Sequence, residues 1–189
     1  MYKKQMTFQR IVCMALLAAC ALVFVYSLGL MTDLYDGVYQ TYRNGVSRIE
    51  GGEIYMDMQE FNRTLTALSI GLILVSAFNL AMGTASRRRY YIGNFVSIAL
   101  CVICNVGVSA WSLIQIMNYR ADYVKIDFEV LNNFPNARYT DSTFWFDASF
   151  VVFGILVVLT ALLVVNLVLK IMVMNSEKRL IGSRKDVRA

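Results

Sequence analysis

The stretch YYIGNFVSIALCVICNVGVSAWSLIQIMNY, from Tyr90 to Tyr119, decides the fold because no Asp, Glu, Lys or Arg interrupts it. A transmembrane helix needs about 20 apolar residues to cross roughly 30 Å of hydrocarbon. The stretch therefore predicts a membrane-spanning helix over residues 92–117. Small or polar residues recur at every fourth position along it, namely Gly93, Ser97, Cys101, Asn105 and Ser109.

Three further apolar runs predict transmembrane helices over residues 11–31, 64–86 and 148–174. The composition agrees, since 58% of the residues are hydrophobic, 16% are charged and the mean hydropathy is +0.53. These values lie outside those of ordinary soluble domains. We expect an all-α membrane protein, a four-helix transmembrane bundle that forms a single membrane domain over residues 1–189.

The first apolar run has a cleavable alternative. Leu17-Ala18-Ala19-Cys20 resembles a lipobox, in which the cysteine would be lipidated and become the new N-terminus. An ordinary signal peptide has an apolar region of only 7–15 residues before its cleavage site. This run stays apolar to Leu30, so we expect an uncleaved helix.

Two longer segments, residues 32–63 and 118–147, connect the predicted helices. In the first, apolar residues at helical spacing indicate that the first helix continues or restarts; they are Leu34, Val38, Tyr42, Val46 and Ile49. The pair Gly51-Gly52 and the alternation over residues 54–58 then predict a β-hairpin near 49–58. Strict alternation predicts a strand over residues 124–130. We expect both to form a small extracytoplasmic β element.

The charges are divided unequally along the chain. Six Lys and Arg residues lie in the two connecting segments, at Arg43, Arg48, Arg63, Arg120, Lys125 and Arg138. Twelve lie elsewhere, at Lys3, Lys4, Arg10, Arg87, Arg88, Arg89, Lys170, Lys178, Arg179, Arg184, Lys185 and Arg188. By the positive-inside rule, both termini, the turn 87–91 and the tail 175–189 are predicted to be cytoplasmic, with the chain in the cell membrane.

Two cysteines carry the one motif with redox precedent, Cys101-Val102-Ile103-Cys104. A membrane thiol oxidoreductase using Cys101 and Cys104 is one alternative. The motif lies about 14–18 Å inside its predicted helix, and a structural thiol buried in apolar surroundings is inert. Packing is the favoured interpretation. The chain has no His, which argues against a conventional zinc site and a His-dependent hydrolase.

The uncharged polar residues within the predicted spans include several serines, Gln115 and four asparagines, Asn79, Asn94, Asn105 and Asn166. Together with the stripe of residues 93–109, they predict either a helix-packing surface or a polar pocket. Coupled transporters normally need an Asp, Glu, Arg or His within a span, and none occurs here. Interhelical hydrogen bonds are therefore favoured, and a small transporter or channel with a polar stripe is the alternative.

Basic residues at the predicted cytoplasmic surface are candidates for contact with anionic lipid. They are Arg87, Arg88 and Arg89 in the turn, with Lys178 and Arg179 in the tail. Each charge near such a surface contributes about 1 kcal/mol of attraction. For the arginine turn, a topology signal alone is the favoured interpretation.

Four segments carry a resemblance to a known group. They are Met6-Thr7-Phe8-Gln9-Arg10-Ile11-Val12-Cys13, Met31-Thr32-Asp33-Leu34-Tyr35-Asp36, Arg87-Arg88-Arg89-Tyr90-Tyr91-Ile92-Gly93-Asn94 and Tyr139-Thr140-Asp141-Ser142-Thr143-Phe144-Trp145-Phe146-Asp147. The chain resembles uncharacterised four-span membrane proteins of Gram-positive (Firmicutes) bacteria, some of them encoded beside carbohydrate ABC transporters. The group implies no activity and no functional residue.

These observations favour a non-enzymatic membrane accessory or scaffold subunit. The resemblance adds a sugar ABC importer as a candidate for the larger complex. The expected partners are the lipid bilayer and either another membrane protein or further copies of the chain. We expect no cofactor, no metal and no nucleic acid.

Overall fold

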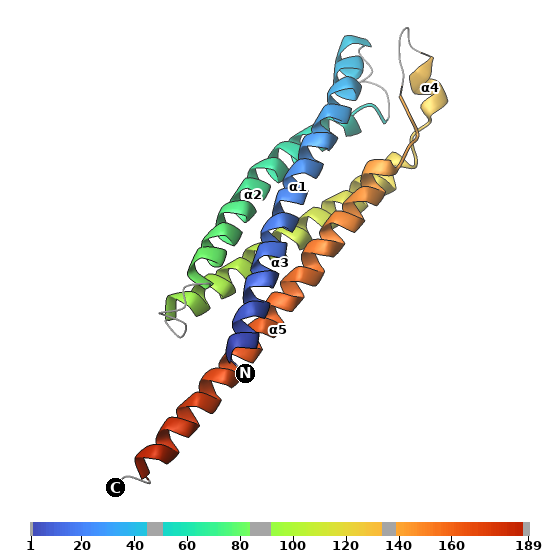
Figure 1. Ribbon diagram of the computed structural model, residues 1–189. Helices are drawn as coiled ribbons and strands as arrows, with labels where there is room; N and C mark the ends of the chain where they lie inside the picture. Colours follow the sequence, from blue (N-terminus) through green and yellow to red (C-terminus); the bar gives the residue numbers. More distant parts are fainter. Residues whose placement is uncertain (1, 45–50, 84–91, 134–138, 187–189) are drawn as a thin grey trace. The chain divides into compact units, whose positions relative to one another are not determined.

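The structure is a computed structural model, and it describes residues 2–44, 51–83, 92–133 and 139–186. Four long helices dominate it: α1 (Tyr2–Asn44), α2 (Ile54–Gly83), α3 (Ile92–Tyr123) and α5 (Phe144–Asp186). A short helix, α4 (Phe128–Asn132), lies between α3 and α5 in sequence (Figure 1). The described residues contain no strand, so the predicted all-α class is confirmed.

All four long helices are long and apolar enough to span a membrane, and the chain is a multi-pass membrane protein. The candidate spans are Lys3–Tyr39, Ile54–Gly83, Ile92–Tyr123 and Phe144–Leu180. Each predicted span falls on one of these helices, although residues 84–86 of the second lie outside the described residues. Many large apolar side chains on all four are exposed, as lipid-facing surfaces require.

The helices are longer than the predicted spans. α1 continues to Asn44 because Leu34, Gly37 and Thr41, at helical spacing, are all buried. This confirms that the first helix continues beyond residue 31. α5 likewise runs through the predicted tail as far as Asp186, so the described part of that tail is helical.

The predicted hairpin near residues 49–58 is wrong where the structure describes it. Gly51 has a φ of 95°, as a turn requires, but α2 begins directly after this turn, at Ile54. Burial follows a helical period, since Tyr55 and Met58 are buried while Met56 is 45% exposed. The alternation was too short to distinguish a strand from the first turns of a helix. Ile49 and Glu50 lie outside the described residues.

The predicted strand over residues 124–130 is also wrong. Asp127 caps α4, because its carboxylate accepts hydrogen bonds from the backbone N–H groups of Glu129 (3.0 Å) and Val130 (3.3 Å). Val124 is 66% exposed, whereas Leu131 is fully buried and anchors the helix. A capping carboxylate thus overrides a strand-like alternation.

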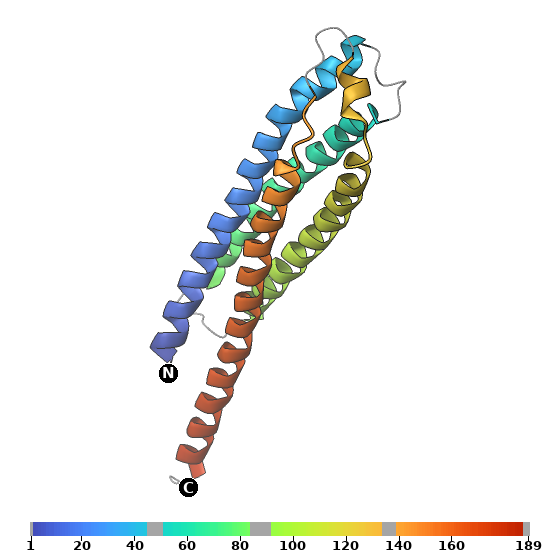
Figure 2. The ribbon, with the colours of Figure 1, turned by 90° about the vertical axis from the view of Figure 1, so that its right-hand side faces the viewer.

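Contacts divide the described chain into two compact units. We call residues 1–20, 72–106 and 156–189 the terminal unit, and residues 21–71 and 107–155 the loop unit. The terminal unit is formed by the beginning of α1, the end of α2, the beginning of α3 and most of α5. In both ribbon views, the first turns of α1 lie beside α5 within this unit (Figures 1 and 2).

Aromatic side chains hold the loop unit together. Tyr26 donates a hydrogen bond to the carbonyl oxygen of Trp145 (3.0 Å), and its ring contacts those of Trp145 and Phe153 edge-on. Tyr55, at the beginning of α2, packs against Tyr123 and Tyr139. α4 is attached to the end of α3 in this unit, because the ring of Phe128 packs against that of Tyr123.

Tyr139 links three parts of the loop unit. Thr41 donates its only hydroxyl proton to the carbonyl oxygen of Gly37 (2.8 Å), so the hydroxyl of Tyr139 donates to Thr41 (2.9 Å). The side chain of Asn132, at the end of α4, bonds both the N–H and the carbonyl oxygen of Tyr139. Burial raises the pKa of the Tyr139 phenol above its usual value, so it stays a neutral donor at physiological pH.

Candidate functional site

A buried polar face on α1 organises the interior of the terminal unit. Gln5, Gln9, Cys13 and Cys20 are spaced by four, four and seven residues, which places them on one side of the helix. All four are buried, and the side chain of Gln9 is fully so. Buried polar groups need hydrogen-bond partners, and α2, α3 and α5 supply them in three successive layers.

The first layer joins α1 to α5 and α2. The amide nitrogen of Gln5 donates to the oxygen of Gln9 (3.1 Å) and to the oxygen of Asn166 (3.0 Å). Gln9 in turn donates to the carbonyl oxygen of Gly83, the last residue of α2. A Cβ atom on Gly83 would lie 2.6 Å from the Gln9 nitrogen, so a larger residue here would displace the Gln9 side chain.

The second layer joins α1, α2 and α3. The side-chain nitrogen of Asn79 donates to the sulfur of Cys13 (3.6 Å), and its oxygen accepts from the hydroxyl of Ser97 (3.3 Å). Asn94 donates to the carbonyl oxygen of Met82 (3.2 Å). These two asparagines therefore fix α2 against the beginning of α3.

The third layer is built around two thiols. Ser76 contacts the sulfur of Cys20 (3.1 Å) and that of Cys101 (3.7 Å). Asn105 donates to the carbonyl oxygen of Cys101 (2.7 Å), and Cys20 donates to the oxygen of Asn105 (3.5 Å). The layer uses small polar groups that satisfy one another.

The CxxC pair lies at this third layer. Cys101 is fully buried and Cys104 half-buried, and both are free thiols. Since Cys101 contacts Ser76 and Asn105, its surroundings are those of a packing residue, not of an exposed, reactive thiolate.

The structure places most of the predicted packing or pocket residues in the interior. Gly93 is the exception and is only half-buried. Four residues rotate about 40° more than one full helical turn. A stripe at every fourth position therefore winds around the helix, and Gly93, at its beginning, lies off the buried face. The buried residues are Ser97, Cys101 and Asn105 with Asn79, Asn94 and Asn166 in the terminal unit, and Ser109 in the loop unit.

The predicted lipid-contact residues are placed only in part. Arg87, Arg88 and Arg89 lie outside the described residues. Lys178 and Arg179 are exposed on α5, within the terminal unit. A shallow niche of about 400 Å³ on α1 adds Lys3 and Lys4 to the exposed cations of this unit.

Lys170 is the residue that the sequence analysis missed. It lies near the end of the predicted span 148–174, where the sequence predicts only a cytoplasmic charge and not a buried side chain. Its side chain is 1% exposed, and its ammonium nitrogen lies 5.1 Å from the centre of the Phe95 ring. Its spacing of four residues from Asn166 puts both on one face of α5, and this spacing was visible in the sequence.

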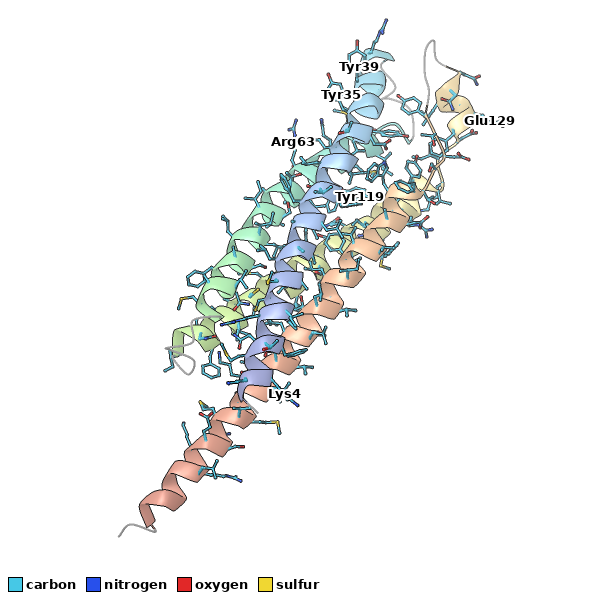
Figure 3. The ribbon with its side chains drawn as sticks, viewed as in Figure 1. Lys4, Tyr35, Tyr39, Arg63, Tyr119 and Glu129 are labelled. Atoms are coloured by element: carbon cyan, nitrogen blue, oxygen red, sulfur yellow. The ribbon has the colours of Figure 1, made fainter. Side chains whose placement is uncertain are left out.

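A groove of about 510 Å³ opens in the loop unit between α1 and α2. Its lining residues are Met31, Thr32, Leu34, Tyr35, Gln59, Asn62 and Arg63. Met31 is 46% exposed and Tyr35 65% exposed. Figure 3 shows Tyr35 and Tyr39 on α1 with Arg63 on the adjoining part of α2.

Asn62 lies at the base of this groove. Its side-chain nitrogen donates to the carbonyl oxygen of Ser27 (3.0 Å), whereas its side-chain oxygen has no hydrogen-bond partner among the described residues. Asn62 is only 2% exposed. The groove therefore combines an exposed aromatic side chain, an exposed sulfur-containing side chain and one cation with a buried amide.

Within the described ranges, no three or more His, Cys, Asp or Glu side chains form a group that could hold a metal ion. Comparisons of the chain with family models, with curated proteins and with solved structures found no match.

Proposed function

We propose that this chain is a non-enzymatic accessory subunit that binds another integral membrane protein through the groove between α1 and α2. The groove is the single observation that carries the proposal. Exposed Tyr, Met and Arg side chains around a recess are the residues most enriched at the centres of protein interfaces. In the interior of the terminal unit, by contrast, most polar groups are paired with one another.

The chemistry of the groove specifies the occupant. It lies where the apolar run of α1 ends, at Met31, so a partner would approach within the bilayer near its boundary. We propose that this partner presents a helix with an acidic side chain opposite Arg63. A sugar importer is one candidate complex, on the strength of the resemblance described above.

We also propose that both termini are cytoplasmic and that the chain lies in the cell membrane. The unequal distribution of Lys and Arg supports this orientation, since twelve lie in the terminal unit and six in the loop unit. Single cysteines introduced at Lys178 and Glu129 test it, because both positions are exposed. An impermeant thiol reagent added to intact cells should label the Glu129→Cys variant and leave the Lys178→Cys variant unlabelled; the reverse pattern would overturn the orientation.

A small transporter or channel is the second candidate, and the geometry supports it less well. Its predicted lining includes Ser97 and Asn105, whose side chains both bond within the terminal unit. The geometry also supports the thiol oxidoreductase alternative less well, because the side chain of Cys101 contacts Ser76 within the terminal unit. Helix packing therefore accounts for Ser97 and Asn105 without a pathway.

Photo-crosslinking tests the docking groove. A photo-reactive residue at Tyr35 should capture one protein of defined mass in high yield. The matched control is Val151, which is 64% exposed on α5 in the same unit and outside the groove. The adduct should disappear when Arg63→Glu is added. An adduct with a second copy of the chain, equal capture from both positions, or capture of lipid alone would each contradict the proposal.

A further inference from the structure

Lys170 is a buried cation that lies over the face of the Phe95 ring. Its ammonium nitrogen has no hydrogen-bond partner among the described residues, although the side chain is 1% exposed. A lysine near the end of a membrane helix ordinarily extends its charge toward the interface. An enclosed ammonium without a counter-charge is costly, so the site calls for an anion.

The terminal unit cannot supply that anion from its own side chains. It contains twelve Lys and Arg residues but only two acids, Glu177 and Asp186. Both follow Lys170 on α5, and the nearer one is seven residues away, roughly 10 Å along the helix. No carboxylate among the described residues bonds to Lys170, so we take its counter-charge to come from outside the chain.

A second open donor lies on the same face of α5. Asn166 is fully buried; its oxygen accepts from Gln5, while its nitrogen has no hydrogen-bond partner in the described part of the chain. One helical turn separates Asn166 from Lys170. We infer that Lys170 and Asn166 together bind one oxyanion of the phosphate class inside the terminal unit.

The donors favour an oxyanion over the other possible occupants. Water would satisfy the hydrogen bonds of both groups but would leave the charge of Lys170 uncompensated. A chloride ion is a single atom and would have to lie within reach of both donors at once, whereas the separate oxygens of a phosphate group bridge donors one turn apart. Phosphate oxygens are also the acceptors that an ammonium binds as a point charge.

Two sources of phosphate fit this chemistry, namely free inorganic phosphate and the headgroup of an anionic phospholipid. Exposed cations on the same unit, including Lys3, Lys4, Lys178 and Arg179, would raise the local concentration of either. The two sources differ in what must be supplied to the purified protein, so one experiment separates them.

The test measures the thermal unfolding temperature of the full chain after removal of lipid. One arm adds inorganic phosphate against chloride at equal ionic strength. The other adds micelles containing phosphatidylglycerol against micelles of phosphatidylcholine alone. We expect phosphate, phosphatidylglycerol or both to raise the unfolding temperature by about 5 °C at saturation, and the arm that responds identifies the source.

Three variants assign the effect to this site. Lys170→Met should abolish the stabilisation, while Lys178→Met, an exposed lysine on the same helix, should retain it. Asn166→Asp keeps the acceptor for Gln5 and places a carboxylate one turn from Lys170. This variant should fold and be stable without added anion, and it should no longer respond to phosphate or phosphatidylglycerol.

Two results would overturn the inference. One is an unfolding temperature of the unmodified protein that is the same in phosphate, chloride and both micelles. The other is that Lys178→Met and Asn166→Asp lose the rise in unfolding temperature to the same extent. That result would assign the effect to general screening of surface charge.

Discussion

The side-chain nitrogen of Gln9 donates a hydrogen bond to the carbonyl oxygen of Gly83 across 2.9 Å, joining the beginning of α1 to the last residue of α2. Because both groups are buried, this bond fixes the distance between the two helices in the terminal unit. Gln9 also accepts from Gln5, so the bond belongs to the layer that includes Asn166.

Gly83→Ala should therefore destabilise the terminal unit. The new Cβ would lie 2.6 Å from the Gln9 nitrogen and would displace that side chain from its acceptor. We expect a loss of about 1–3 kcal/mol in the free energy of unfolding. The matched control is Gly71→Ala on the same helix, where no atom lies within 4 Å of the added Cβ. Equal effects of both substitutions on denaturant unfolding would contradict this prediction.

In the loop unit, Thr41→Val should weaken the attachment of Tyr139 to α1. The substitution removes the acceptor of the buried Tyr139 hydroxyl and leaves it unpaired, at a cost of about 1–3 kcal/mol. Thr32→Val is the control, because Thr32 is exposed and its hydroxyl bonds only to its own helix. If thermal unfolding of the two variants is indistinguishable, the Thr41–Tyr139 bond does not stabilise the unit.

Asp127→Ala should melt α4. Without the carboxylate, the N–H groups of Glu129 and Val130 lose their acceptor, and the cap contributes about 1 kcal/mol. Hydrogen exchange should show faster exchange at these two amides, while Asp127→Asn should preserve most of the protection. Strand-like protection at alternate residues of 124–130 would instead restore the β interpretation.

The four membrane helices were predictable because long uncharged runs have few alternatives in lipid. The structure of the connecting segments was not predictable, because helix capping and contacts between distant residues compete there with the local pattern of apolar residues. Asp127 caps a helix where the alternation predicts a strand. At residues 54–58 the alternation combines buried Ile54 and Met58 with exposed Met56, so it does not follow one face of α2. No local pattern predicts that Tyr139 contacts Thr41, nearly a hundred residues away.

In the candidate site, too, the sequence predicts some features and not others. The buried asparagines were found because amides are rare in apolar runs, but their partners depend on how the helices pack. The sequence predicts Lys170 as a charge at the cytoplasmic end of its span, because a lysine there usually extends to the interface. Its burial depends on the orientation of α5, which an almost uniformly apolar helix does not reveal.

A thiol-labelling experiment separates the accessory subunit from the channel. Ser109 is 3% exposed, so a cysteine there should react with an impermeant reagent at least about a hundredfold more slowly than one at exposed Glu129. The half-buried Cys104 is first replaced by Ala to lower the background. Comparable rates at the two positions would mean that water reaches the stripe and would favour the channel.

The most direct test of the central claim is the mass of the complex released from native membranes at native abundance. Native mass spectrometry in mild detergent should find the 21.4 kDa chain in a stoichiometric complex with a different membrane protein, and Arg63→Glu should dissociate it. Recovery of the unmodified chain alone, or only as copies of itself, would contradict an accessory subunit that docks through α1 and α2.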